Sequence, residues 1–500
     1  VHPLLDTTPA LMSSPPQHEP PGHEVPVSDE EHGDNSLQEP FIPKHSVVQQ
    51  VTSFSLNVWR VIVFSGIFIS ICCLKGSRAA IDASIPALTS EKTTLGMNNF
   101  RAAIMLAFGN AMRVVGKIVW GFILDSSLAS PKMWLCCAHL IMALLFFFFG
   151  SSHSYGALCF FWSAYMFWIA VPWPTATKIL HAWSNKSHYN MVMSLMSLNS
   201  RTSQFLVALT SAALLHAGIS WRNLFHFYPL LMILSFVYAV FTLKSTPREI
   251  GATIDEKEPT RVDDKTQAEA LVLFLTSARF WMMNISTGLA SCLMELQSFT
   301  PLYFKNEKQL FAGNAVFAAV PFHLGAVLSL FFTKPFDWMS HKQRIIHLTL
   351  LNVVIVTLFL VLAIWTHIHV AVSACIFFVC GWSISFQYYV PSNLFTMEYG
   401  GRHIAKLSTL QDSIQYSFVI VFDVFAGYLI KDEQWTKFFV VCAALSVVGG
   451  VASILFFIFE SRAHQREKNM RRAASGGGGD DAQSQLLSKT DSEVWSQSEG

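Results

Sequence analysis

Long apolar runs alternate with short polar connectors along most of the chain. We interpret twelve of these runs as membrane spans, because each is long enough to cross about 30 Å of hydrocarbon as a helix. Their expected limits are 57–75, 98–124, 132–150, 154–182, 189–216, 223–243, 279–304, 311–333, 344–366, 369–397, 404–430 and 435–459. The pattern predicts an all-α membrane protein of twelve transmembrane helices in two six-helix bundles.

The longest polar stretch inside the apolar part, residues 245–270, divides the spans six and six. The two halves resemble each other: "VPWPTATK" ends the fourth span and "VPSNLFTME" the tenth, while "GFILDSS" and "KPFDWMS" follow the second and eighth. Such a repeat predicts pseudo-symmetric bundles with a site between them. The expected organisation is a disordered tail at 1–52, a bundle at 53–244, a loop at 245–276, a bundle at 277–460 and a disordered tail at 461–500.

Lysine and arginine are distributed unequally between the two sides of the predicted bundles. They are concentrated in the connectors that share a side with the tails, and a further group including Arg462, Arg466 and Arg471 follows the last span. The positive-inside rule therefore predicts a multi-pass protein with both termini in the cytosol. The sequence does not identify the host membrane.

Composition narrows the function further. The chain is 52% hydrophobic and only 13% charged, and its net charge of +1 gives no basic field for nucleic acid. All nine cysteines lie in apolar runs without the spacing of a zinc site or a disulfide framework. We find no phosphate-binding loop and no catalytic motif, and we expect neither an enzyme, nor a cofactor, nor a metal.

Four cations lie at depths where exposure to lipid is costly. Arg113 and Lys117 are four residues apart and share one helix face, and Arg78 and Arg201 belong to the same half. They are expected to meet in an aqueous cavity, where an anion finds charge-assisted hydrogen bonds. The alternative is internal pairing, for which the candidate acids are Asp82, Glu295, Asp412 and Asp423. For Glu295 itself, substrate contact, proton coupling and gate pairing all remain open.

The motif "GKIVWGFILDSSLASPK" resembles the signature of the major facilitator superfamily between its second and third spans. In that family the region works at the cytosolic gate, which is the role the resemblance implies for Asp125 and for Asp337 in the matching place. Glu398 and Arg402 lie near the same cytosolic ends, and we assign them to gate pairing as well.

Within the superfamily, "PWPTATKILHAW", "ISWRNLF" and "TPREIG" are similar to motifs of the organophosphate:phosphate antiporters. The resemblance implies that Arg78, in "RAAIDASIP", and Lys117 hold the anion, and that Asn199 replaces a histidine, with Arg201 two residues on. The family's second arginine falls at Leu293, and the nearby charge is Glu295, of opposite sign. We hypothesise that Arg113 supplies the missing cation.

These observations predict an alternating-access secondary transporter for a small organic anion, including a phosphate ester exchanged for phosphate. A second interpretation is a carrier of an amino acid or another zwitterionic or neutral metabolite, proton-coupled or not, in which Glu295 answers the amino group. A third is a transport-inactive receptor or scaffold. The expected partners are a small-molecule substrate and the lipid bilayer, without nucleic acid, and the expected state is a monomer.

Overall fold

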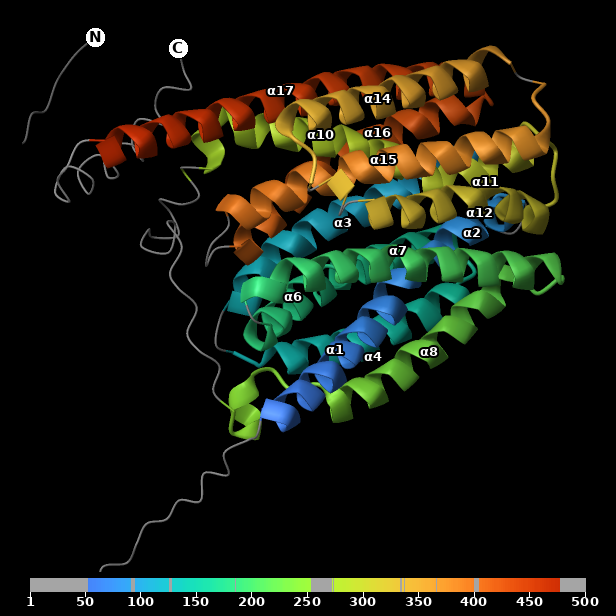
Figure 1. The fold of residues 1–500 in the computed structure, drawn as a ribbon. Helices are drawn as coiled ribbons and strands as arrows, with labels where there is room; N and C mark the ends of the chain where they lie inside the picture. The colour runs from blue at the N-terminus through green and yellow to red at the C-terminus, as the bar shows by residue number, and fades with distance from the viewer. Residues whose placement is uncertain are drawn as a thin grey trace, which may run out of the picture. The chain divides into compact units, whose positions relative to one another are not determined.

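The computed structural model describes residues 53–90, 95–125, 128–184, 186–252, 272, 274–332, 335–336, 338–365, 367–399 and 404–476 (Figure 1). Every regular element in these ranges is a helix. The first half comprises α1 (Ser53–Gly76), α2 (Arg78–Leu88), α3 (Asn99–Asp125), α4 (Pro131–Gly150), α5 (Tyr155–Trp168), α6 (Pro172–Trp183), α7 (Lys186–His216) and α8 (Trp221–Thr242), followed by the short helix η1 (Pro247–Ile250).

The second half comprises α10 (Ala278–Met294), α11 (Leu296–Asn306), α12 (Ala312–Ser329), η2 (Leu330–Phe332), α14 (His341–Ile364), α15 (Val370–Tyr399), α16 (Ile404–Lys431) and α17 (Trp435–Gly476). Ten spans among the described residues are long and apolar enough to cross a bilayer. They include α1 with α2 and α5 with α6 as continuous spans. We count α7, and α10 with α11, as the two remaining spans, which keeps twelve as our assignment.

The observed helices differ from the expected spans at two places. The first span continues to Leu88 instead of ending at residue 75. Arg78 and Asp82 interrupt the apolar run in the sequence, but the chain that carries them is still helical, as α2. The last helix, α17, runs to Gly476 and includes the first part of the segment that we expected to be a flexible tail.

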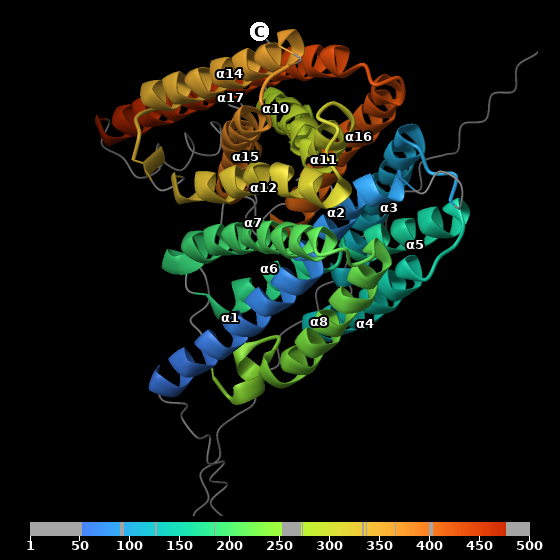
Figure 2. The ribbon, with the colours of Figure 1, turned by 90° about the vertical axis from the view of Figure 1, so that its right-hand side faces the viewer.

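Among the described residues, the two halves meet chiefly along three helix pairs, α3 with α16, α7 with α12, and α2 with α11 (Figure 2). The first pair joins the second and eleventh spans, and the second pair joins the fifth and eighth. These two pairs are equivalent when the chain is divided six and six, as the repeat in the sequence predicts.

Glycine allows helices within a half to approach closely. A Cβ atom on Gly325 of α12 would lie 2.0 Å from the carbonyl oxygen of Phe378, and one on Gly381 of α15 would lie 2.0 Å from that of Phe322. Neither position has room for a side chain, so the two glycines allow α12 and α15 to pack at this separation.

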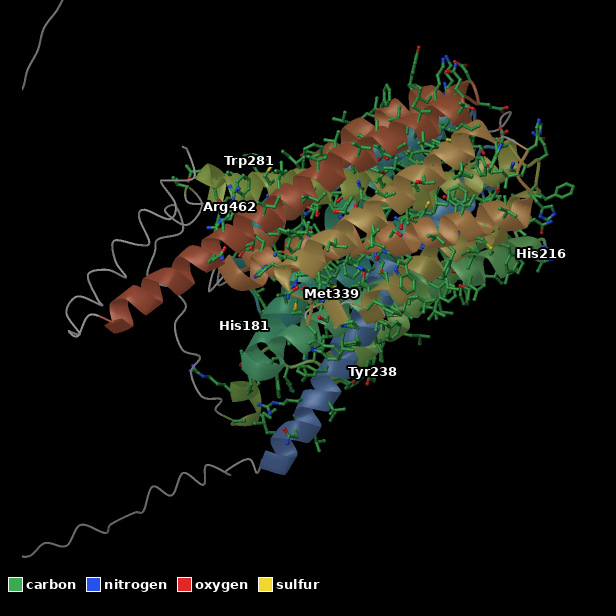
Figure 3. All side chains as sticks on the ribbon, turned by 45° about the horizontal axis from the view of Figure 1, so that its top comes forward. His181, His216, Tyr238, Trp281, Met339 and Arg462 are labelled. Atoms are coloured by element: carbon green, nitrogen blue, oxygen red, sulfur yellow. The ribbon has the colours of Figure 1, made fainter. Side chains whose placement is uncertain are left out.

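We name the two ends of the bundle by their residues. The tail end is where α1 begins at Ser53, and the far end is where α2 finishes at Leu88. In Figure 3, Arg462 and Trp281 lie at the tail end and His216 lies at the far end.

Candidate functional site

The first and seventh spans are each interrupted at one residue, and opposite charges lie at the two interruptions. Ser77 separates α1 from α2, and Glu295 separates α10 from α11. Arg78, the first residue of α2, donates from one guanidinium nitrogen to both carboxylate oxygens of Glu295, at 2.7 and 2.5 Å. Both side chains are buried, with about 5% of Arg78 and 3% of Glu295 exposed. Broken helices near the bilayer midplane are typical of transporter binding sites.

The antiparallel contact of α3 with α16 places the remaining charges of the second span against the other half. Lys117 Nζ donates to Asp412 Oδ2 at 2.5 Å. One helical turn away, the guanidinium of Arg113 stacks on the ring of Tyr416, with its carbon atom 3.8 Å from the ring centre. Arg113 and Lys117, which share one face of α3, therefore differ. The carboxylate of Asp412 neutralises Lys117, whereas no carboxylate among the described residues pairs with Arg113.

The same contact continues toward the far end. Asn110 Nδ2 donates to Asp423 Oδ2 at 2.7 Å, and Asn99 Nδ2 donates to the carbonyl oxygen of Ile430 at 3.4 Å. Polar contacts thus cross between the halves along much of the length of α3.

A cavity of two adjoining chambers lies between the halves. The deep chamber, which Arg78 and Glu295 line, has a volume of ≈ 50 Å³, and the outer chamber measures ≈ 110 Å³, taken as space open to the centres of water molecules. Each can hold several waters, since one water needs about 10–15 Å³ by this measure. The residues common to both chambers are Lys75, Arg113, Ser200, Tyr388 and Tyr389.

The outer chamber leads toward the tail end. Ser194 and Asn393, which are exposed, line it together with Thr177. At the far end, by contrast, contacts between the halves close the path. Lys305 Nζ donates to the carbonyl oxygen of Pro86 at 2.7 Å, and His216 Nδ1 lies 2.7 Å from Asn314 Oδ1.

Three cations that line the cavity form no ion pair with a carboxylate in the described part of the chain. Lys75 lies over the ring of Trp173, at 4.8 Å from its centre, and Arg113 stacks on a tyrosine as described. Arg201 donates to the hydroxyl of Tyr389 at 2.7 Å and to Gln204 Oε1 at 3.0 Å. Aromatic faces stabilise cations without neutralising them, so the charges remain available to an anion.

The predicted substrate residues are brought together only in part. Arg78, Arg113, Arg201 and Glu295 line the deep chamber. Lys117, only 1% exposed, is not among the lining residues of either chamber and is held by the carboxylate of Asp412. Asn199 is also absent from both linings, and its amide donates to the carbonyl oxygen of Phe68 at 2.8 Å.

The predicted gate residues fall outside the described residues. Asp337 and Arg402 lie in the undescribed ranges, and the side chains of Asp125 and Glu398 are not described either. Their pairing stays a prediction.

Sequence reasoning did not select Lys75 as a site residue, although it lines both chambers. Its signal is its position three residues before Arg78, which places the two cations near each other at the break between helices. Lys75 ends an apolar run, where a lysine usually reaches toward the membrane surface, so the sequence pattern alone does not mark it as a site residue.

The fold and the sequence both have known counterparts. The family model described as Major Facilitator Superfamily matches residues 63–422. No curated protein matches the chain. Among solved structures, a bacterial homologue of the human lysosomal transporter Spinster, in an inward-facing and unoccupied conformation, shares 15% sequence identity and a TM-score of 0.57, covering 80% of this chain and 95% of that one. At this identity the likeness shows the fold alone, whereas the family model covers more than half of the chain. The chain therefore belongs to the Major Facilitator Superfamily and is a secondary transporter of the membrane rather than an enzyme.

Proposed function

We propose that this transporter carries a small organic anion, which binds in the cavity between the two halves. The observation that supports the proposal is the set of three lining cations, Lys75, Arg113 and Arg201, that lack a carboxylate partner among the described residues. With Arg78 they make four cationic side chains around the two chambers, against two carboxylates, Glu295 and Asp412.

The charge imbalance is large enough to select the substrate. A unit negative charge about 4 Å from one of these cations gains roughly 4 kcal/mol at an effective dielectric constant of about 20. A cation placed in the same cavity would meet repulsion of similar size. Arginine also offers two parallel N–H donors to a carboxylate or phosphate, which adds geometric selectivity to the charge.

The ion pair between Arg78 and Glu295 couples binding of the anion to the contact between the halves. The pair joins α2 of the first half to the seventh span of the second. An anion that binds Arg78 competes with Glu295 for the guanidinium and so loosens a contact between the halves. Binding and opening are then linked, as alternating access requires.

The class of anion is a further part of the proposal. Motifs in the first half resemble the organophosphate:phosphate antiporters, which favours a phosphate ester exchanged for phosphate. The second candidate is an amino acid or similar zwitterion. It is favoured by one observation, the adjacency of Arg78 and Glu295, which together offer a cation to a carboxylate and a carboxylate to an amino group.

Uptake and counterflow in proteoliposomes separate these possibilities. The panel comprises phosphate, sugar phosphates, dicarboxylates and amino acids, each measured with and without a pH gradient. Flux of phosphate or of an organic anion supports the proposal, and phosphate-driven exchange supports the phosphate-ester class. Amino-acid uptake that phosphate does not affect would replace it with the second candidate. Absence of flux for every compound would overturn the proposal of an anion carrier and favour a receptor or scaffold.

Arg113→Gln tests the role of the unpaired cations. Losing a hydrogen bond to a charged group costs about 1.5–3 kcal/mol, which corresponds to roughly a 10–150-fold loss of apparent affinity for the anion. The matched control is Lys437→Gln, which removes an exposed cation at the start of α17, at the far end of the bundle. Equal affinities for the two variants would contradict the proposed site.

A further inference from the structure

Asp423 of α16 is a fully buried carboxylate that contacts the opposite half through an amide. It is 0% exposed, and Asn110 of α3, which donates to its Oδ2 at 2.7 Å, is 1% exposed. The other carboxylate oxygen, Oδ1, has no hydrogen-bond partner among the described residues, and neither has Oδ1 of the asparagine. Two buried acceptor oxygens in one contact thus lack a donor, although buried polar atoms are nearly always paired.

The charged groups that face Asp423 do not compensate it. They are Glu295, Arg78 and Asp82, and the thiol of Cys292 lies nearby as a further titratable group. The only cation in this set, Arg78, is already bound by both oxygens of Glu295. Asp82 in turn accepts a hydrogen bond from a serine hydroxyl at 2.6 Å. One guanidinium therefore serves three buried carboxylates.

Leaving Asp423 ionised in this environment is costly. Removing a carboxylate from water costs several kcal/mol even after relaxation of the protein, and an ion pair offsets this only when a cation is close. A protonated carboxyl group avoids the penalty and gains an O–H donor. The missing donor in the contact with Asn110 and the missing charge compensation are then supplied by the same proton.

We propose that Asp423 and Asn110 form a proton-binding site, and that the transporter carries a proton together with its substrate. The coupling to substrate rests on the proposed function above, whereas the site itself does not. A proton fits the contact better than a divalent metal ion, because the contact offers one carboxylate and one amide, whereas Ca²⁺ takes six to eight oxygen ligands and Mg²⁺ an octahedral set. The described residues also contain no group of three acidic, histidine or cysteine side chains that could hold a metal.

The location of the site links proton binding to the movement of the halves. Asp423 belongs to the second half and Asn110 to the first, and α16 continues eight residues beyond Asp423 to the far end at Lys431, which is about 12 Å of helix. Opening the far end separates α3 from α16, removes the amide and admits water. The carboxyl group takes its proton from that water before the far end closes. When the tail end is open, the proton leaves through Glu295, which faces Asp423 and lines the deep chamber, and passes to the water of the cavity.

Infrared difference spectroscopy of the purified protein tests the site without any substrate. The carbonyl stretch of a protonated carboxylic acid is expected near neutral pH in the wild type and is lost in Asp423→Asn. The matched control is Asp432→Asn, which removes an exposed carboxylate directly after the end of the same helix, and it should leave that band in place. If Asp423→Asn does not fold, Asn110→Leu keeps the acid and is expected to shift the band by removing its partner.

Two spectroscopic results would overturn the site: a band that survives in Asp423→Asn with no shift in Asn110→Leu, or a band that Na⁺ removes at constant pH. The coupling is tested separately, with whichever anion of the panel is transported. An inwardly directed proton gradient should increase its accumulation in the wild type, and Asp423→Asn should abolish that increase. Accumulation that is independent of the gradient would overturn the coupling, while the spectrum still reports the site.

Discussion

The pair of Lys117 and Asp412 predicts unequal effects when each partner is removed alone. Lys117 has 1% of its side chain exposed, whereas Asp412 has 23% exposed and lines the outer chamber. Asp412→Asn leaves an ammonium group buried without a counter-charge, which costs about 3–5 kcal/mol. Lys117→Met leaves a carboxylate that water in the cavity can solvate, so its cost should lie below that range.

Thermal unfolding of the purified protein in detergent measures the difference. A loss of 1 kcal/mol lowers Tm by roughly 2–4 °C for a unit of 150–250 residues, which is about the size of one bundle. Asp412→Asn should therefore lower the apparent Tm by about 6–20 °C, and Lys117→Met by less. The double variant should be more stable than Asp412→Asn alone, because it removes the unpaired charge. Additive losses, or a larger loss for Lys117→Met, would refute the reasoning.

Two further predictions concern the packing and the movement of the halves. Gly381→Ala should lower expression and the recovery of monodisperse protein on size exclusion, since its Cβ would lie 2.0 Å from a carbonyl oxygen. Gly156→Ala, whose Cβ would meet no atom within 4 Å, should lower neither. Equal behaviour of the two variants would contradict this account of the contact. His216→Cys combined with Asn314→Cys, in a background without native cysteines, should allow a short cleavable thiol cross-linker to hold the far end closed. Uptake should then stop and should return on reduction, and uptake that persists through complete cross-linking would contradict closure at this end.

Much of the fold follows from local sequence, because a membrane span needs a continuous apolar run of set length. Helices such as α4 (Pro131–Gly150) and α14 (His341–Ile364) therefore fall close to their expected limits. The apolar pattern gives the wrong limit where charged residues of the site interrupt a span. Residues 78–88 carry Arg78 and Asp82 and look like a connector, yet they form α2, because the partners of these charges lie in the other half.

The site was predictable in its components and not in its pairing. Burial cost identified Arg78, Arg113 and Arg201 as charges that need an aqueous or protein environment, and all three line the cavity. Local sequence could not show which cation takes which acid, since Arg78 and Glu295 are 217 residues apart along the chain. Such a pairing depends on how the two bundles meet, which no local pattern encodes.

The two stacked cations of the second span have separate roles, and the difference follows from what α16 places opposite each. Lys117 faces a carboxylate and helps to join the halves, so its charge is unavailable unless that contact opens. Arg113 faces an aromatic ring, which stabilises the charge and leaves its donors unused by any carboxylate in the described chain. Further along the same helix, Asn110 faces an acid that lacks a cation. A single helix contact thus presents a paired charge, an unpaired cation and an uncompensated acid in succession. Separating α3 from α16 would change the environment of all three together, which is how an anion and a proton could be bound in one conformation and released in the other.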